Sequence, residues 1–208
     1  MADAEHKLTR REEYAQATRA AIIDAARKLF AERGFFATTV DDIAAKARVA
    51  PATVYAVAGG KQGLINELVR IWSTDPAIES TLERVKTSAD GREIIVITGE
   101  ASRAHRERFG DLMRVLLNTA PHDAAIAEQL AGVTELYRGS FVEFAARLVE
   151  LGALRDGIDG KYAVDMLWFY FGYSSYFTLH DDNGWSYKHA EQWLVAQACR
   201  ELLPPTSK

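Results

Sequence analysis

The stretch "TTVDDIAAKARVAPATVYA", residues 38–56, decides the fold of the N-terminal third of this chain. Thr39, followed by the acidic Asp42, is typical of a helix start, and Pro51 has the fixed φ that suits the first position of another helix. The pattern predicts two short helices, 39–46 and 51–57, with a tight connection at Arg48–Val49. Alanines allow such helices to pack closely, so this spacing is typical of a helix-turn-helix.

The second of these helices carries small or hydrogen-bonding residues on its expected outer face: Ala52, Thr53, Tyr55 and Ala56. Small side chains let a helix lie deep in a DNA major groove, where base edges and thymine methyl groups are within reach. Two unrelated short helices joined by a turn give the same pattern. The spacing alone therefore leaves DNA binding as one of two readings.

The glycines and lysine of "VAGGKQGL", residues 57–64, raise the alternative of a nucleotide-binding loop. That loop requires Gly-x-x-x-x-Gly-Lys-[Ser/Thr] after a strand. Here Tyr55 occupies the position of the first glycine, Gln62 follows Lys61, and the preceding element is helical. The motif fails on all three requirements, although a helix start preceded by glycines still attracts anions.

Residues 20–68 resemble the N-terminal domain of TetR-family transcriptional regulators. The matching features are Ala25–Ala26, Leu29–Phe30, Gly34, Thr38–Thr39, "DIAAKA" (42–47), "TVY" (53–55), Lys61 and Leu64. The resemblance implies an all-α protein: a helix-turn-helix DNA-binding domain over 1–60, continuing into a helix at 61–73, and an effector-binding and dimerisation domain over 74–208.

The resemblance also implies which residues contact DNA. They are Thr39, Val40, Asp41, Pro51, Ala52, Thr53, Tyr55, Ala56, Val57 and Lys61. Tyr55 and Lys61 would bind phosphates, while Ala52, Thr53 and Ala56 would face bases. This chain departs from the family pattern at Ala50, which offers no side-chain cap, at Ala56–Val57, which offers few hydrogen bonds, and at Ala58, where a phenylalanine is common. We therefore expect thymine methyl contacts and DNA shape to supply much of the specificity.

The totals agree with a DNA-binding head on an acidic body. The net charge is −4, divided into +2 over residues 1–72 and −6 over residues 73–208. The single cysteine, Cys199, fits a reducing compartment. The charged start of the chain predicts no signal peptide, and the apolar run 166–179 is too short to span a membrane. We expect a cytoplasmic protein without membrane contact, and without a metal or other cofactor, because the histidines lack ligand spacing.

Helical periodicity continues to the end of the chain. Beyond the head helices, which start near Thr9, Thr39, Pro51 and Lys61, it predicts helices at 78–87, 90–107, 108–119, 123–151, 159–180 and 186–203. The segment 163–180 is dense in aromatic residues around its whole circumference, so it must be covered on both sides. One cover is expected to be a second copy of the chain. The resemblance implies a homodimer through 159–180 and 186–203, in which Gly172 and Ser175 would allow close approach.

An effector pocket is expected between helices within about residues 90–180. The candidate lining residues are Trp72, Phe109, Met113, Leu116, Tyr137, Phe141, Trp168, Phe169, Tyr173 and Phe177, each of which is equally compatible with plain core packing.

The leading hypothesis is a ligand-responsive, sequence-specific transcriptional regulator and not an enzyme: a repressor that binds a palindromic operator in double-stranded DNA as a dimer and is released by a small hydrophobic effector. Two alternatives remain open. One is a helical enzyme or small-molecule carrier with an incidental helix-turn-helix, although no nucleophile–base pair can be assembled from the sequence. The other is an architectural DNA-binding dimer without an effector.

Overall fold

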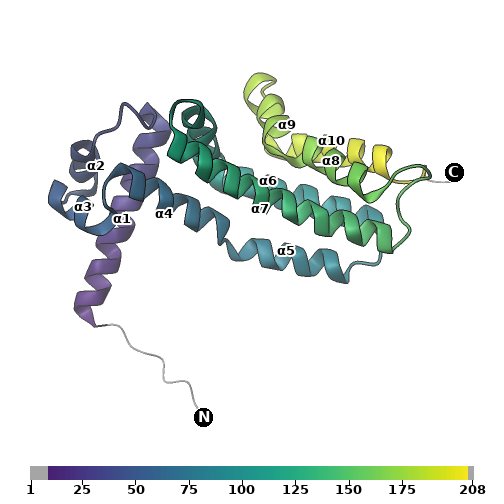
Figure 1. Cartoon of the computed structure of the whole chain (residues 1–208), viewed down its shortest axis with the longest axis horizontal. Coiled ribbons are helices and arrows are strands. Elements are labelled where there is room, and N and C mark those ends of the chain that lie inside the picture. The colour runs from purple at the N-terminus through teal and green to yellow at the C-terminus, as the bar shows by residue number, and fades with distance from the viewer. Residues whose placement is uncertain (1–8, 206–208) are drawn as a thin grey trace, which may run out of the picture.

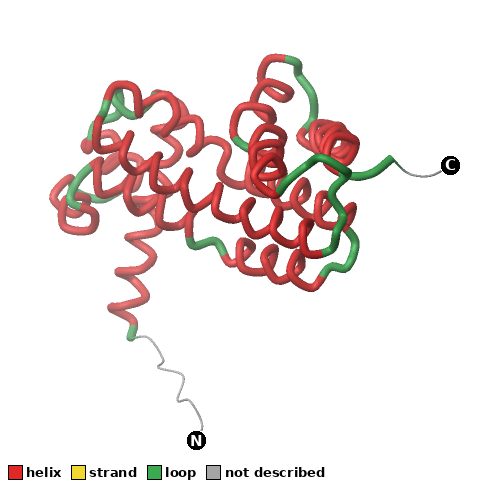
Figure 2. The backbone as a smooth tube through the Cα atoms, turned by 45° about the vertical axis from the view of Figure 1, so that its right-hand side comes forward, coloured by secondary structure: helices red, strands yellow, loops and turns green. Residues whose placement is uncertain are grey.

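A computed structural model describes residues 9–205 of the chain, which are helical with no strand among them (Figures 1 and 2). The head contains α1 (Arg10–Arg33), α2 (Val40–Ala47), α3 (Pro51–Ala58) and α4 (Lys61–Ser73). The remaining elements are α5 (Pro76–Thr87), α6 (Gly91–Thr119), η1 (Ala120–His122), α7 (Ala124–Glu150), α8 (Gly160–Phe171), α9 (Tyr173–Phe177), η2 (Thr178–Asp182) and α10 (Tyr187–Leu202). Both views place α2 and α3 at one end of the molecule and α8 and α10 away from them.

The helix starts of the head follow from local capping, as the sequence predicts. Thr9 caps α1 by accepting from the Glu12 N–H, and the Glu12 carboxylate accepts in return from the Thr9 N–H at 2.8 Å. Thr39 and Asp42 repeat this arrangement at α2. Each capping box satisfies two backbone donors that a helix start otherwise leaves without partners.

The head is a compact helix-turn-helix packed on α1 and α4. Arg48 ends α2 in the left-handed region, at φ 58° and ψ 44°, which turns the chain sharply toward α3. Val54 is completely buried and holds α3 in place. Glu67 of α4 pairs with Arg70 of its own helix at 2.8 Å and with Arg19 of α1 at 3.1 Å, and the two guanidinium groups, Arg70 first, lower the pKa of the Glu67 carboxyl to about 2.

Two predicted helix boundaries in the rear are wrong. The segments 90–107 and 108–119 form one helix, α6, because Phe109, Met113 and Leu116 continue the buried stripe through the expected break. Gly110 stays helical there, and a Cβ on it would stand 3.3 Å from the Tyr187 hydroxyl.

The predicted helix 159–180 is interrupted at Gly172. Its N–H still bonds to the Trp168 carbonyl at 2.7 Å, but the backbone then becomes extended, and a Cβ there would lie 2.4 Å from that same carbonyl oxygen. Gly172 thus accommodates Trp168 of its own chain, and the Ser175 hydroxyl donates to the Phe169 carbonyl. Both residues therefore have a role in ending α8 within their own chain, and their close approach to a partner stays a prediction.

The core consists of two buried clusters joined along α6. The first combines head residues such as Ile22, Phe30 and Leu64 with Phe109 and Met113 of α6. The second combines the N-terminal half of α6 with α7, α8 and α10, through residues such as Ile95 and Leu194. The head therefore shares its core with the front of the rear helices.

We predict that Gly63→Ala destabilises the head, because a Cβ on Gly63 would lie 1.6 Å from the Ala58 carbonyl oxygen. Backbone must move to relieve that overlap, and we expect a loss of about 1–3 kcal/mol in the free energy of unfolding, measured by urea denaturation. Gly132→Ala on α7 is the control, because nothing lies within 4 Å of its Cβ position. That substitution should stabilise by about 0.5–1 kcal/mol. Equal effects of the two substitutions would contradict the close approach of α3 and α4.

Candidate nucleic-acid interface and effector cavity

The helix α3 presents four of the ten predicted DNA-contacting residues to solvent. Six of the predicted residues are exposed: Thr39, Asp41, Pro51, Ala52, Tyr55 and Ala56. The other four, Val40, Thr53, Val57 and Lys61, are half-buried. The buried Val54 on the opposite side of α3 fixes which face points outward. The structure thus brings the predicted residues together at the starts of α2, α3 and α4.

Tyr55 is the largest exposed group on α3, with 57% of its surface accessible. Its ring lies beside Gly60, so that a Cβ on Gly60 would stand 3.3 Å from the Tyr55 Cε1. Gly60 has φ 100° and ψ −164°, a conformation that favours glycine, and it begins α4. The Tyr55 hydroxyl and the free N–H groups of the first turn of α4 therefore belong to one surface, which suits an anion.

The side chain of Lys61 lies against Phe35. Its ammonium donates to the Phe35 carbonyl oxygen at 2.8 Å and lies 4.5 Å from the centre of the Phe35 ring. Partial burial lowers the pKa of Lys61. An ammonium has three donors, so the group can keep this bond and still offer hydrogens to a phosphate.

Val40 and Val57 contribute less to the outer face than the resemblance implies. Both pack against the head core. The Val57 carbonyl accepts from the Arg19 guanidinium at 3.2 Å, which ties the end of α3 to α1. Their side chains are directed partly toward the core, which leaves the outer face even more dependent on Ala52, Thr53 and Ala56.

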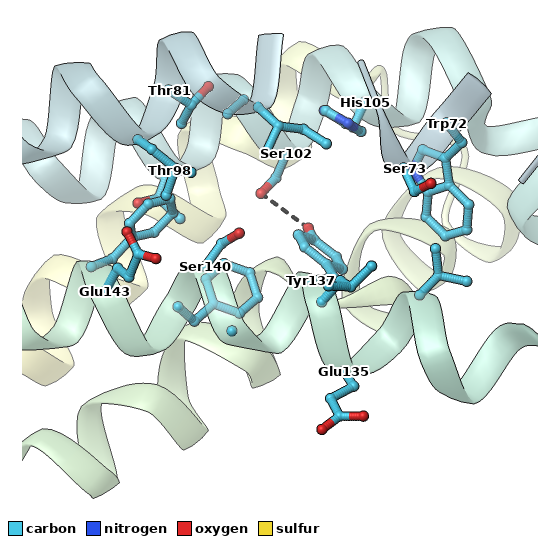
Figure 3. A pocket seen from close by; sticks show the side chains of 18 of the residues that line it. Trp72, Ser73, Thr81, Thr98, Ser102, His105, Glu135, Tyr137, Ser140 and Glu143 are labelled. Carbon is cyan, nitrogen blue, oxygen red and sulfur yellow. Dashed lines mark hydrogen bonds between the residues drawn. The ribbon is translucent and has the colours of Figure 1, made fainter. Parts of the chain in front are cut away.

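A cavity of about 510 Å³ lies between the C-terminal end of α4 and the helices α5, α6 and α7 (Figure 3). Four of the predicted pocket residues line it: Trp72, Met113, Tyr137 and Phe141. The other six do not: Phe109, Leu116 and Tyr173 are buried in the core, Trp168 packs against both clusters, Phe177 lies under the Arg114 guanidinium, and Phe169 is 63% exposed.

Sequence reasoning missed the contribution of α5 and the polar wall of α6. Ile78, Thr81 and Leu82 line the cavity from α5, and Thr98, Ser102 and His105 line it from α6. A search for aromatic residues could not find them. Thr98, Ser102 and His105 are spaced four and three residues apart, which places them on one face of a helix, and this spacing is the pattern that carried the information.

The polar groups of the cavity gather where α6 faces α7. The Ser102 and Tyr137 hydroxyls lie 3.3 Å apart, drawn as the dashed line in Figure 3, and the Tyr137 hydroxyl donates to the Phe171 carbonyl at 2.6 Å. Burial lowers the pKa of the His105 imidazole below its usual value. The Glu135 carboxylate points away from the other labelled side chains.

Within residues 9–205 no cluster of His, Cys, Asp or Glu has a metal-binding arrangement. No helix in the same range is both long and apolar enough to cross a bilayer.

Comparison with known proteins agrees with the head and the helical body. Residues 22–68 match the family described as "Bacterial regulatory proteins, tetR family". Over these residues the chain resembles the N-terminal domain that this family model describes. An uncharacterized HTH-type transcriptional regulator, YdeS of Bacillus subtilis (strain 168), is 26% identical over 156 residues, which cover 74% of this chain and 75% of that protein. A second Bacillus subtilis regulator, YvkB, is 25% identical over 152 residues, covering 73% and 78%.

Solved TetR-like structures share the fold over almost the whole chain. A SmeT–triclosan complex superposes with a TM-score of 0.74 at 20% identity, covering 92% of this chain and 94% of that one. A putative transcriptional regulator from Saccharomonospora viridis in complex with choline gives 0.75 at 18% identity, covering 91% and 100%. The all-α prediction is confirmed, and the matched head together with the two relatives indicates a DNA-binding transcriptional regulator.

We predict that Ala50→Ser stabilises the recognition helix. Ala50 is the residue before α3 and makes no side-chain capping bond, whereas a serine hydroxyl would accept from a free N–H of the first turn. The expected gain is about 1 kcal/mol in the free energy of unfolding, measured by urea denaturation. Ala50→Val is the control, since it adds volume without an acceptor. If both variants change stability equally, the cap is not the cause.

Proposed function

We propose that this regulator is a repressor that binds a palindromic operator as a homodimer and is released by a small, largely hydrophobic effector. One observation carries the proposal: α4 extends from the DNA-facing surface to the cavity. Lys61 is the first residue of α4, and the Tyr55 ring lies beside the preceding Gly60. At the other end of the helix, Trp72 and Ser73 line the cavity. Its 13 residues span about 20 Å.

A ligand in the cavity would act on the head through the end of α4. The helix is packed into the shared core through Leu64, Ile65 and Leu68, so it moves as a rigid body with the head. A ligand that fits one position of Trp72 better than another shifts the population between head orientations. The apolar walls of the cavity favour a hydrophobic effector.

The dimer would form through α8 and α10. Tyr162 and Phe169 on α8 and Trp193 on α10 have 41%, 63% and 42% of their surfaces exposed. Exposed aromatic residues on neighbouring helices are typical of a protein interface. A twofold axis there would carry two α3 helices to successive major grooves of a palindrome.

Neither alternative from the sequence is favoured by a specific contact. Within the described residues the cavity hydroxyls of Ser102 and Tyr137 bond to each other and to a backbone carbonyl, and not to a base that would activate a nucleophile. An architectural DNA-binding dimer without an effector gives no reason for a cavity of about 510 Å³ beside α4.

We predict that Tyr55→Ala/Lys61→Ala weakens binding to DNA from the region upstream of the chain's own gene. The measurement is fluorescence anisotropy over a salt series. Each lost phosphate contact should reduce the slope of log K against log[salt] by about 0.9. Lys86→Ala is the matched control, because Lys86 is an exposed lysine on α5. The same slope for wild type and double mutant would remove this surface from the interface.

We also predict that replacing the thymines of the bound DNA by uracils lowers affinity while leaving the salt slope unchanged. The outer face of α3 offers Ala52 and Ala56 to the major groove, and these can contact methyl groups but not hydrogen-bond to bases. Salt slope counts phosphates and is independent of methyl contacts. Unchanged affinity after the substitution would contradict an apolar contact to thymine.

A further inference from the structure

Arg106 of α6 is a fully buried cation without a counter-ion. It is 1% exposed, and its side chain is the bulkiest of those fully buried in residues 9–205. One terminal nitrogen donates to the Tyr137 hydroxyl at 3.1 Å, and the other donates to the Phe171 carbonyl at 3.0 Å. The Nε is buried without a partner, and within the described residues no carboxylate forms an ion pair with this guanidinium.

Part of this arrangement has a structural explanation. Phe171 is the last residue of α8, so Arg106 caps a free carbonyl of that helix. The rings of Tyr137, Tyr173 and Tyr176 surround the guanidinium, with their centres 5.4, 5.7 and 5.3 Å from its carbon atom. A neutral donor could cap the carbonyl equally well, however, and a buried charge without a counter-ion costs several kcal/mol. The full positive charge remains to be explained.

The hydroxyl of Tyr137 connects this charge to the cavity. Tyr137 lines the cavity, and its hydroxyl accepts from Arg106 while donating to Phe171. If the Tyr137 hydroxyl rotates and donates to a ligand, the Phe171 carbonyl still accepts the hydrogen bond from Arg106. The Ser102 hydroxyl, which lines the cavity from α6, can rotate in the same way (Figure 3). Two hydroxyl donors beside a buried cation suit a negatively charged acceptor.

We propose that the effector is an amphipathic carboxylic acid, bound as its anion with the carboxylate on the Ser102 and Tyr137 hydroxyls and the charge of Arg106 behind them. The apolar part of the ligand would lie along Ile78, Leu82 and Phe144. A cation at the same place would meet a like charge in a medium of low dielectric constant. A neutral alcohol would gain the hydrogen bonds but not the attraction. This assignment rests on the proposed function, in which the cavity is the effector site.

The test compares three probes of equal chain length, decanoate, 1-decanol and decylammonium, at pH 7.5 with the full chain. Binding is measured by isothermal titration calorimetry and by the intrinsic tryptophan fluorescence, to which Trp72 in the cavity wall contributes. Decanoate should bind at least about tenfold more tightly than decanol, and decylammonium most weakly. Tyr137→Phe and Arg106→Met should each bring the decanoate-to-decanol ratio toward one.

Controls separate recognition of the carboxylate from a structural role. Ser140→Ala removes another cavity hydroxyl, which within the described residues forms no hydrogen bond with Ser102 or Tyr137, and it should leave the ratio unchanged. A purely structural Arg106 would weaken decanoate and decanol equally. Tyr137→Phe keeps the ring in place, so the ratio can be measured even where Arg106→Met does not fold.

A parallel anisotropy measurement on DNA distinguishes the two levels of the proposal. Decanol or decylammonium binding as tightly as decanoate would overturn the acidic ligand and leave the cavity as an effector site. DNA binding by a protein that takes up none of the three probes would also overturn the acidic ligand, without affecting the DNA-binding surface. Wild-type protein that binds no DNA would overturn the proposed function itself.

Discussion

The burial of α6 in both core clusters, one at each half of the helix, is the constraint on which the rest of the structure depends. Its N-terminal half, with Ile94 and Ile95, packs into the rear cluster, and its C-terminal half, with Phe109 and Met113, packs into the cluster of the head. Arg27 of α1 reinforces the second contact by holding both carboxylate oxygens of Asp111 at 2.7 Å. Because one helix belongs to both clusters, a change in its surroundings at one end is felt at the other, and the head cannot be described as an independent domain on a flexible linker.

The buried polar groups of α6 occupy the place where these two clusters meet. Arg106 and Tyr137 both bond to the Phe171 carbonyl, the last one of α8, while the Tyr137 ring forms part of the cavity wall. The wall of the cavity and the end of a helix of the proposed dimer interface are therefore stabilised by the same hydrogen bonds. A ligand that accepts the hydrogen bond of the Tyr137 hydroxyl would therefore remove one of the two bonds to the last carbonyl of α8, without a long pathway between distant sites.

The sequence predicts the features that depend on neighbours within one turn. The side chains of Thr9 and Thr39 start α1 and α2 by accepting hydrogen bonds from backbone N–H groups three residues later. Pro51 starts α3 because its fixed φ suits the first helical position. Gly172 ends a helix for a different reason, the position of the Trp168 carbonyl and ring, and the pattern of apolar residues does not contain that information. The cavity was predicted in part. Its aromatic residues are evident in the sequence, but Thr98 and Ser102 line the cavity only because of how α5 and α7 are placed around α6. The contact of Lys61 with Phe35, 26 residues earlier in the chain, was equally out of reach.

The small residues of α3 place a particular demand on the head. A recognition helix rich in bidentate side chains can tolerate an error in position, because each base contact corrects the register. Ala52 and Ala56 offer only methyl groups, so the register must come from phosphate contacts held on a rigid frame. The capping boxes at Thr9 and Thr39, the tie between Arg19 and the Val57 carbonyl, and the shared core supply that rigidity. In the proposed mechanism the response to a ligand is a change in the orientation of the whole head through α4. A small rotation would suffice, because a dispersion contact loses a quarter to a half of its energy when the gap widens by about 0.5–1 Å.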